Sequence, residues 1–155
     1  MAAFSTSGAI TATISNTDIA ELDDLTTASA DQLTITVAST SATAAQLKTV
    51  GDATGLNVTA TAVETVTGTA TQMDALLAVE GSTGDKVNLD ADYAITISGS
   101  TATVTQANAY ATAAGVVTAT ISNTDIADLD DLTTASTDQL TITVASTSAT
   151  AAQLT

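Results

Sequence analysis

Carboxylates are the main side chains of this sequence that could take part in acid–base catalysis or bind a metal ion, and they occur in clusters. Four acidic residues lie close together near the N-terminus, and four more recur at the same spacing later in the chain: Asp18, Glu21, Asp23, Asp24, Asp125, Asp128, Asp130 and Asp131. Paired carboxylates can hydrolyse a glycoside by acid–base catalysis. These carboxylates have no aromatic platform and no basic neighbour, so we interpret them as helix-start and surface charges. We therefore expect no enzyme activity and no catalytic residue.

A third group of oxygen-bearing side chains lies in one short segment, at Asp85, Asn88, Asp90 and Asp92. Carboxylate and amide oxygens are the ligands that calcium prefers. The spacing lacks the glycine and the closing glutamate of an EF-hand loop, and it lacks a glycine-rich nonapeptide pattern. Two interpretations stay open, a solvated surface loop and a calcium site that stabilises the fold.

Threonine hydroxyls alternate with apolar residues in six segments. If neighbouring strands align, two columns of hydroxyls are expected, formed by Thr11, Thr34, Thr59, Thr96, Thr118 and Thr141, and by Thr13, Thr36, Thr61, Ser98, Thr120 and Thr143. Threonine is favoured on a solvated sheet face. The pattern also resembles the Thr-x-Thr arrays of β-solenoid ice-binding proteins. A grid that binds ice, a polysaccharide or another copy of the chain is therefore an alternative to a plain solvated face.

Composition excludes several classes of function. Lysine and arginine total 2 against 17 acidic residues, which gives a net charge of −15, and there is no histidine or cysteine. Two lysines cannot neutralise a row of phosphates, so we expect no nucleic-acid partner. Zinc sites, thiolate nucleophiles and disulfides are excluded. No apolar run approaches about 20 residues, so we expect no membrane insertion.

A long internal duplication organises the chain. Residues 10–47 and 117–154 align without gaps and are identical at 35 of 38 positions. The 155 residues are thus expected to form one domain that is a slice of a longer array. Its period is a 107-residue super-repeat over 10–116, which restarts at 117. Within it we distinguish four degenerate units of about 22–34 residues.

Each unit contains a helix-start pattern, in which a capping side chain is followed three residues later by an acidic residue or glutamine. The predicted starts are Asp18, Thr43, Thr69, Thr103, Asp125 and Thr150. Small or apolar residues follow at positions one, four and seven after the first five starts, as in Ala44, Leu47 and Val50. This spacing predicts short helices with one buried stripe.

Alternating segments precede the helix starts, and period-two alternation predicts strands. Strands linked through helices pair in parallel with right-handed connections. The sequence therefore predicts an α/β fold, a right-handed repeat solenoid of β-α units with one parallel sheet and a layer of short helices. An all-β solenoid is the alternative, because threonine lowers helix propensity. The expected core contains Leu33, Ile35, Val37, Ile95 and Ile97, and closely packed alanines are expected at Ala12, Ala60 and Ala119. An extra strand or loop is expected within 85–92.

Segments 31–38, 66–73 and 117–126 resemble the tandem repeats of giant Cys-free bacterial cell-surface proteins, of the marine cyanobacterial type, and of large adhesin-like proteins. The resemblance implies an extracellular or cell-surface location and a structural role in motility or adhesion. It implies adjacent copies of the same repeat as partners, and it carries no catalytic residue. A stiff spacer, a surface-binding module and a calcium-stabilised repeat are the three functions that remain open.

Overall fold

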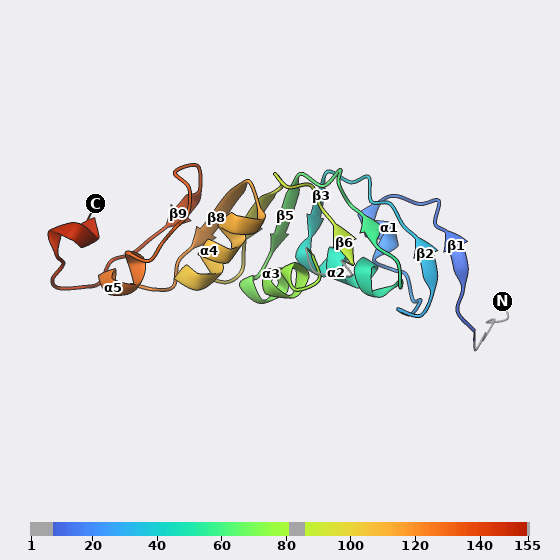
Figure 1. Cartoon of the computed structure of the whole chain (residues 1–155), viewed down its shortest axis with the longest axis horizontal. Helices are drawn as coiled ribbons and strands as arrows, with labels where there is room; N and C mark the ends of the chain where they lie inside the picture. Colours follow the sequence, from blue (N-terminus) through green and yellow to red (C-terminus); the bar gives the residue numbers. More distant parts are fainter. Residues whose placement is uncertain (1–7, 81–85, 155) are drawn as a thin grey trace.

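The computed structural model describes residues 8–80 and 86–154 of the chain. These residues form an elongated body with the two chain ends at opposite tips (Figure 1). In chain order the elements are β1 (Thr11–Thr13), α1 (Ile19–Leu22), β2 (Gln32–Thr34), β3 (Ser41–Thr43), α2 (Ala44–Asp52), β4 (Val58–Thr59), β5 (Thr65–Gly68), α3 (Ala70–Leu77), β6 (Val87–Asn88), β7 (Ala94–Ile97), α4 (Val104–Ala113), β8 (Val116–Thr120), α5 (Ile126–Leu129), β9 (Gln139–Thr141) and a final 3-10 helix (Ala151–Leu154).

The helices begin where the sequence predicts. Thr43, Thr69 and Thr103 each form a complete capping box with the glutamine three residues later. Asp18 and Asp125 accept a hydrogen bond from the backbone N–H two residues on. A side-chain acceptor at this position satisfies an amide that the first helical turn leaves unpaired. The α-helices of the described residues make the all-β alternative wrong.

Every strand pairing among the described residues is parallel, as predicted, but the strands form more than one sheet. A five-stranded sheet has the order β3-β5-β7-β8-β9, and β1-β2 and β4-β6 form two-stranded sheets. In the larger sheet each strand is followed by a helix before the next strand begins. The prediction of one sheet was wrong because two short strands, and not one, precede each of the helices α2, α3 and α4.

The two small sheets are joined into one row by a parallel bridge between Thr36 and Thr59. The Val37 N–H donates to the Thr59 carbonyl at 2.8 Å, and the Thr59 N–H donates to the Ile35 carbonyl at 3.1 Å. The segments 33–37 and 58–62 are therefore neighbours that run in the same direction. This adjacency is the expectation on which the predicted stacking of units depends, and it is confirmed.

The core lies between the strands and the helix row, and its buried residues run from Ile19 to Leu129. Leu33, Ile35, Val37, Ile95 and Ile97 are all buried, as predicted. The helix stripes bury their first and second members in all five α-helices, among them Ala44, Leu47, Met73, Ala107 and Leu129. Full burial of a leucine or methionine side chain such as Leu47 or Met73 contributes about 1.5–3 kcal/mol. Ala60 and Ala119 are buried, whereas Ala12 is exposed on the outer strand β1.

Within 85–92, where an extra strand or loop is expected, residues 87 and 88 form the short strand β6. Val87 pairs with Val58 in parallel, and Val87 and Leu89 are buried. Glycine is required shortly after the next strand, β7, because Gly99 has φ of +71°.

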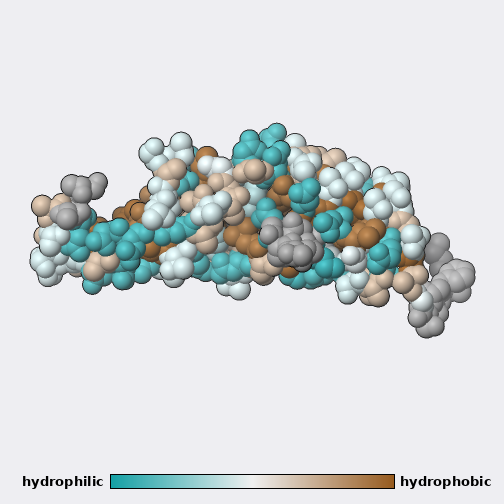
Figure 2. All heavy atoms as spheres, in the orientation of Figure 1, coloured by the Kyte–Doolittle hydropathy of each residue, from teal (hydrophilic) through white to brown (hydrophobic). Residues whose placement is uncertain are grey.

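Figure 2 shows hydrophobic residues along the middle of the body and hydrophilic residues along the margin where the helices lie.

Candidate functional surfaces

The threonine side chains of the predicted grid point away from the core. Thr96 and Thr118 are half-buried, and the other ten members are exposed, namely Thr11, Thr13, Thr34, Thr36, Thr59, Thr61, Ser98, Thr120, Thr141 and Thr143. An alternating strand places every second side chain on one face, which explains this orientation. Eight of the twelve residues lie in strands, whereas Thr36, Thr61, Ser98 and Thr143 lie outside the named strands, and a binding role for this hydroxyl face stays a prediction.

The two predicted columns are wrong in register. Thr13 lies opposite Thr34, and Thr120 lies opposite Thr141, each two residues from the predicted partner. Thr36 lies opposite Thr59. The predicted pair of Thr96 and Thr118 is observed, but Thr59 and Thr96 belong to different sheets. A shift of two residues keeps the hydroxyls on their face, so the face survives while the continuous columns do not.

An aspartate at the start of a strand fixes this register. The Asp31 carboxylate accepts hydrogen bonds from the Ile10 N–H at 2.8 Å and from the Ala28 N–H at 3.0 Å. Gln32 is thereby placed opposite Thr11. These two hydrogen bonds hold the pKa of Asp31 below its usual 3.8, and the bond from the Ala28 N–H has the larger effect. This role was not predicted from the sequence, although an aspartate precedes the same strand in both copies.

The second copy repeats the arrangement. The Asp138 carboxylate accepts from the Val117 N–H and the Ala135 N–H, both at 2.8 Å. Ser39 Oγ accepts from the first N–H of α1 at 3.0 Å, and Ser146 Oγ accepts from the first N–H of α5 at 2.8 Å. Equivalent side chains thus bond one segment to its neighbour in both copies of the super-repeat.

Ser100 and Asn123 make the corresponding contact for two other helices. Ser100 Oγ accepts from the first N–H of α3 at 2.9 Å, and Asn123 Oδ1 accepts from the first N–H of α4 at 3.0 Å. Each acceptor lies 19 to 30 residues further along the chain than its donor. The free amide of a helix start is therefore used to bind the following segment.

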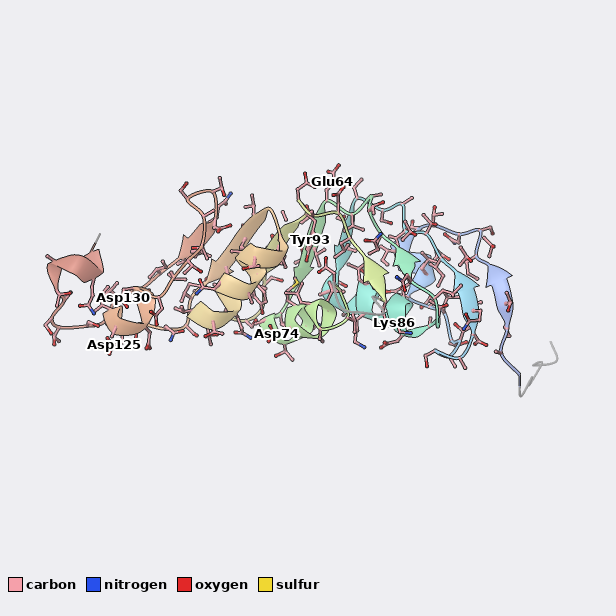
Figure 3. The ribbon with its side chains drawn as sticks, viewed as in Figure 1. Glu64, Asp74, Lys86, Tyr93, Asp125 and Asp130 are labelled. Atoms are coloured by element: carbon pink, nitrogen blue, oxygen red, sulfur yellow. The ribbon has the colours of Figure 1, made fainter. Side chains whose placement is uncertain are left out.

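The acidic clusters lie on the surface. Asp18 and Asp125 are helix caps, Asp23 is half-buried, and the others are exposed, namely Glu21, Asp24, Asp128, Asp130 and Asp131. Figure 3 shows Asp74, Asp125 and Asp130 on the helix side, and Glu64 on the opposite margin. This placement agrees with solvated and capping charges.

The predicted calcium ligands do not form a compact cluster in the part of the chain that the structure describes. Asp85 lies outside the described residues. Asn88 is exposed in β6, and the Asp90 carboxylate accepts from the Ala91 N–H at 2.7 Å. Asp90 and Asp92 line an open hollow together with Glu64. No group of three or more acidic, histidine or cysteine side chains among the described residues is arranged to hold a metal ion. Calcium binding stays a prediction.

Two buried tyrosines bond helix-side carboxylates. The Tyr110 hydroxyl donates to Asp74 Oδ1 at 2.7 Å and to the Ala70 carbonyl at 3.0 Å, which joins α4 to α3. The Tyr93 hydroxyl donates to Glu80 Oε2 at 2.8 Å. Burial raises the pKa of both hydroxyls far above 10.0, and the adjacent carboxylates raise it further. Tyr110 lies seven residues after the predicted helix start Thr103, in the predicted buried stripe, whereas a role for Tyr93 was not predicted from the sequence.

An apolar surface lies at the C-terminal end of the body. We call Leu140, Ile142 and Val144 the C-terminal apolar face. Ile142 is 44 % exposed and Val144 is 53 % exposed. Strand β9 is the last strand of its sheet, so one of its edges has no strand partner among the described residues.

Comparisons with known proteins give no relative for this chain. No protein-family model, no curated protein and no solved structure matches it. Within 8–80 and 86–154, none of the helices has the length and apolar character needed to cross a membrane.

Proposed function

We propose that this chain is a structural repeat module, a right-handed α/β solenoid that serves as a stiff spacer in a very large extracellular surface protein. Each unit buries its apolar stripe against the next unit, which makes the stack the stable form. The observation that carries the proposal is the recurrence of one bonding pattern in both copies of the super-repeat. Asp31 and Asp138 each accept two backbone N–H groups of the same relative position.

The surface chemistry supports a structural role over a catalytic one. The described carboxylates cap helices, bond backbone or tyrosine groups, or are exposed, and the chain has no histidine or cysteine. A net charge of −15 per chain of this length keeps a protein built from many copies soluble, and it repels other negatively charged surfaces. The absence of cysteine and the resemblance to giant surface proteins support a location outside the cell, with motility or adhesion as the process served.

Solution scattering of one-copy and two-copy chains tests the spacer role. In the two-copy chain, residues 10–116 occur twice in succession. Strands of a sheet are about 4.8 Å apart, so four added units lengthen the particle by about 19 Å without widening it. A maximum dimension that does not increase, or a particle that widens instead, would reject the spacer.

A second candidate is a surface-binding module that uses the threonine face. The observation that favours it is the set of directly opposed threonines, of which Thr36 and Thr59 are the most central exposed pair. Thermal hysteresis of the wild type is compared with that of Thr36→Lys plus Thr59→Lys. Hysteresis that the two lysines abolish supports ice binding, and its absence from concentrated wild type rejects it.

A further inference from the structure

One asparagine of the chain is followed, two positions later, by a hydroxyl residue. Asn57 has Thr59 at this position and Val58 in between, whereas an acidic or aromatic residue stands there for the other four asparagines, Asn16, Asn88, Asn108 and Asn123. Asn-x-Thr without a central proline is the acceptor sequence of N-linked glycosylation. Three residues also match by chance, so the place of this segment in the fold decides whether it can be modified.

The fold turns both recognition groups of this segment outward. Asn57 directly precedes β4, and Thr59 is the last residue of that strand. Both are exposed, whereas Val58 between them is 0 % exposed. Side chains alternate along an extended segment, so the Asn57 carboxamide and the Thr59 hydroxyl lie on the same solvated face. The opposite register would bury both groups, so the inward side chain of Val58 is what makes the site accessible.

The Asn57 carboxamide and the Thr59 hydroxyl are available to an enzyme. Among the described residues, neither the side chain nor the backbone of Asn57 forms a hydrogen bond, and the Thr59 hydroxyl forms none either. Asn108 and Asn123, in contrast, each use both ends of the carboxamide in hydrogen bonds. Modification of Asn57 therefore breaks no contact of the fold.

The loop before Asn57 is open at its tip and fixed at its base. Gly55, Leu56 and Asn57 are exposed in succession, and Leu56 is 36 % exposed although it is apolar. Thr54, directly before them, is fully buried, and its hydroxyl accepts from the Leu33 N–H at 2.9 Å and from the Leu56 N–H at 3.1 Å. A loop that a rigid scaffold holds in this way presents its exposed residues to a partner enzyme.

We propose that Asn57 is an N-glycosylation site. The donor is a sugar activated as a glycosyl phosphate, linked to a lipid or to a nucleotide. The Asn57 side-chain nitrogen forms a bond to the anomeric carbon, the bond from that carbon to the phosphate oxygen breaks, and the phosphate leaves with the electron pair. The nitrogen loses one proton, and nothing is oxidised or reduced. The inference rests on the proposed extracellular function and adds a covalent modification to it.

A glycan at Asn57 determines how the threonine face can be used. Thr59 lies opposite Thr36, and this exposed pair is the one on which a surface-binding role depends most. An N-linked glycan is bulky and solubilising. Attached next to Thr59, it keeps a flat solid from contacting these hydroxyls. The modified chain therefore fits a solvated spacer better than a surface-binding module.

Mass spectrometry of the protein purified from the cells that make it tests the site. The two lysines, Lys48 and Lys86, define the tryptic peptide 49–86, in which Asn57 is the only asparagine. We expect this peptide to carry added sugar mass, and fragmentation to place that mass on Asn57. A peptide 49–86 that is unmodified in exported wild-type protein would overturn the proposal.

Four variants, made in the same cells, separate the sequence requirement from other attachment of sugar. Asn57→Gln and Thr59→Ala each lose the sugar completely, and Thr59→Ser keeps it because the hydroxyl is retained. The matched control is Asn88→Gln, which changes an exposed asparagine of the neighbouring strand β6 and leaves the modification at the wild-type level. All three positions are exposed, and circular dichroism establishes that each variant is folded.

Sugar that persists in Asn57→Gln, or in Thr59→Ala at the wild-type level, contradicts the proposal, because attachment then does not depend on the acceptor sequence. A chain retained inside the cell identifies the donor. Sugar on the retained and the exported chain supports the site with a nucleotide-linked donor, and sugar on the exported chain alone supports it with a lipid-linked donor.

The scattering measurement keeps the two proposals distinguishable. An unmodified Asn57 together with normal lengthening of the two-copy chain rejects the glycosylation site and leaves the spacer role intact. A modified Asn57 in a chain that does not lengthen supports the site and rejects the spacer.

Discussion

Ile35 and Ile142 have identical sequence neighbours on both sides, yet Ile35 is 1 % exposed and Ile142 is 44 % exposed. The difference arises from the strand that pairs next to Ile35, in which Thr59 donates to its carbonyl. The burial of Ile35 therefore depends on the neighbouring segment that pairs beside it.

This relationship predicts two different costs for one substitution. Ile35→Ala lowers the free energy of unfolding by about 2–5 kcal/mol, because it removes buried methyl groups and leaves a cavity. Ile142→Ala changes it by less than about 1 kcal/mol, because the side chain is half in solvent. Urea unfolding of both variants measures the difference, and equal costs would contradict unit-on-unit burial.

The two tyrosines predict a loss of stability in alkali. The pKa of Tyr93 and of Tyr110 is raised in the folded chain, whereas the unfolded chain titrates near 10.0. Above pH 10 the unfolded state therefore loses protons that the folded state keeps, and the free energy of unfolding falls as pH rises. Absorbance at 295 nm measures the ionisation of the tyrosines directly, because the chain has two tyrosines and no tryptophan.

The control for the tyrosines is Tyr110→Phe, which removes the hydroxyl bonded to Asp74 and keeps the ring in the core. The substitution costs about 1–3 kcal/mol at neutral pH, because the hydroxyl bonds both a carboxylate and the Ala70 carbonyl. The substitution also makes the free energy of unfolding fall less steeply above pH 10. A wild-type protein whose tyrosines both ionise near pH 10 while it remains folded would contradict this account.

Asp31 predicts a loss of stability in acid. Its pKa is held down in the folded chain, chiefly by the Ala28 N–H and then by the Ile10 N–H, so the stabilisation is complete well above the ordinary value of 3.8. The stabilisation declines as pH falls towards that value and is lost below the lowered pKa. Asp31→Asn, which keeps the shape and removes the charge, lowers Tm at pH 7 and flattens its fall towards pH 3.

Asp24→Asn is the matched control for Asp31, because it removes one negative charge from an exposed position. Its Tm profile should follow that of the wild type closely. If the two asparagine variants show the same profile, net charge and not the register-setting hydrogen bonds governs stability in acid.

The sequence predicted the local features well. The helix starts and buried stripes were found because a capping side chain and its glutamine lie three residues apart, as in Thr69 and Gln72. These contacts are complete within one helical turn, so residue spacing alone determines them. The buried residues Leu33 and Ile95 followed from period-two alternation in the same way.

Features that depend on neighbouring segments were predicted less well. Strands β3 and β5 were missed because β3 ends at the cap residue Thr43 itself and β5 ends directly before the cap Thr69. Ser41-Ala42-Thr43 also carries almost no apolar pattern. The threonine register was wrong because it depends on Asp31 bonding Ile10, 21 residues away. The hydroxyl face itself was found, since a two-residue shift leaves side-chain direction unchanged.

The most direct test of unit-on-unit burial places a further unit directly after the segment that contains Ile142. In an extended chain a copy of residues 48–116 follows Leu154, in the order that residues 48–116 follow Leu47. The free energy of unfolding is then compared with and without Ile142→Ala. We expect the cost to rise from less than about 1 kcal/mol to about 2–5 kcal/mol, the value for Ile35→Ala. A cost that stays below about 1 kcal/mol in a folded extended chain would contradict the stacked-repeat account.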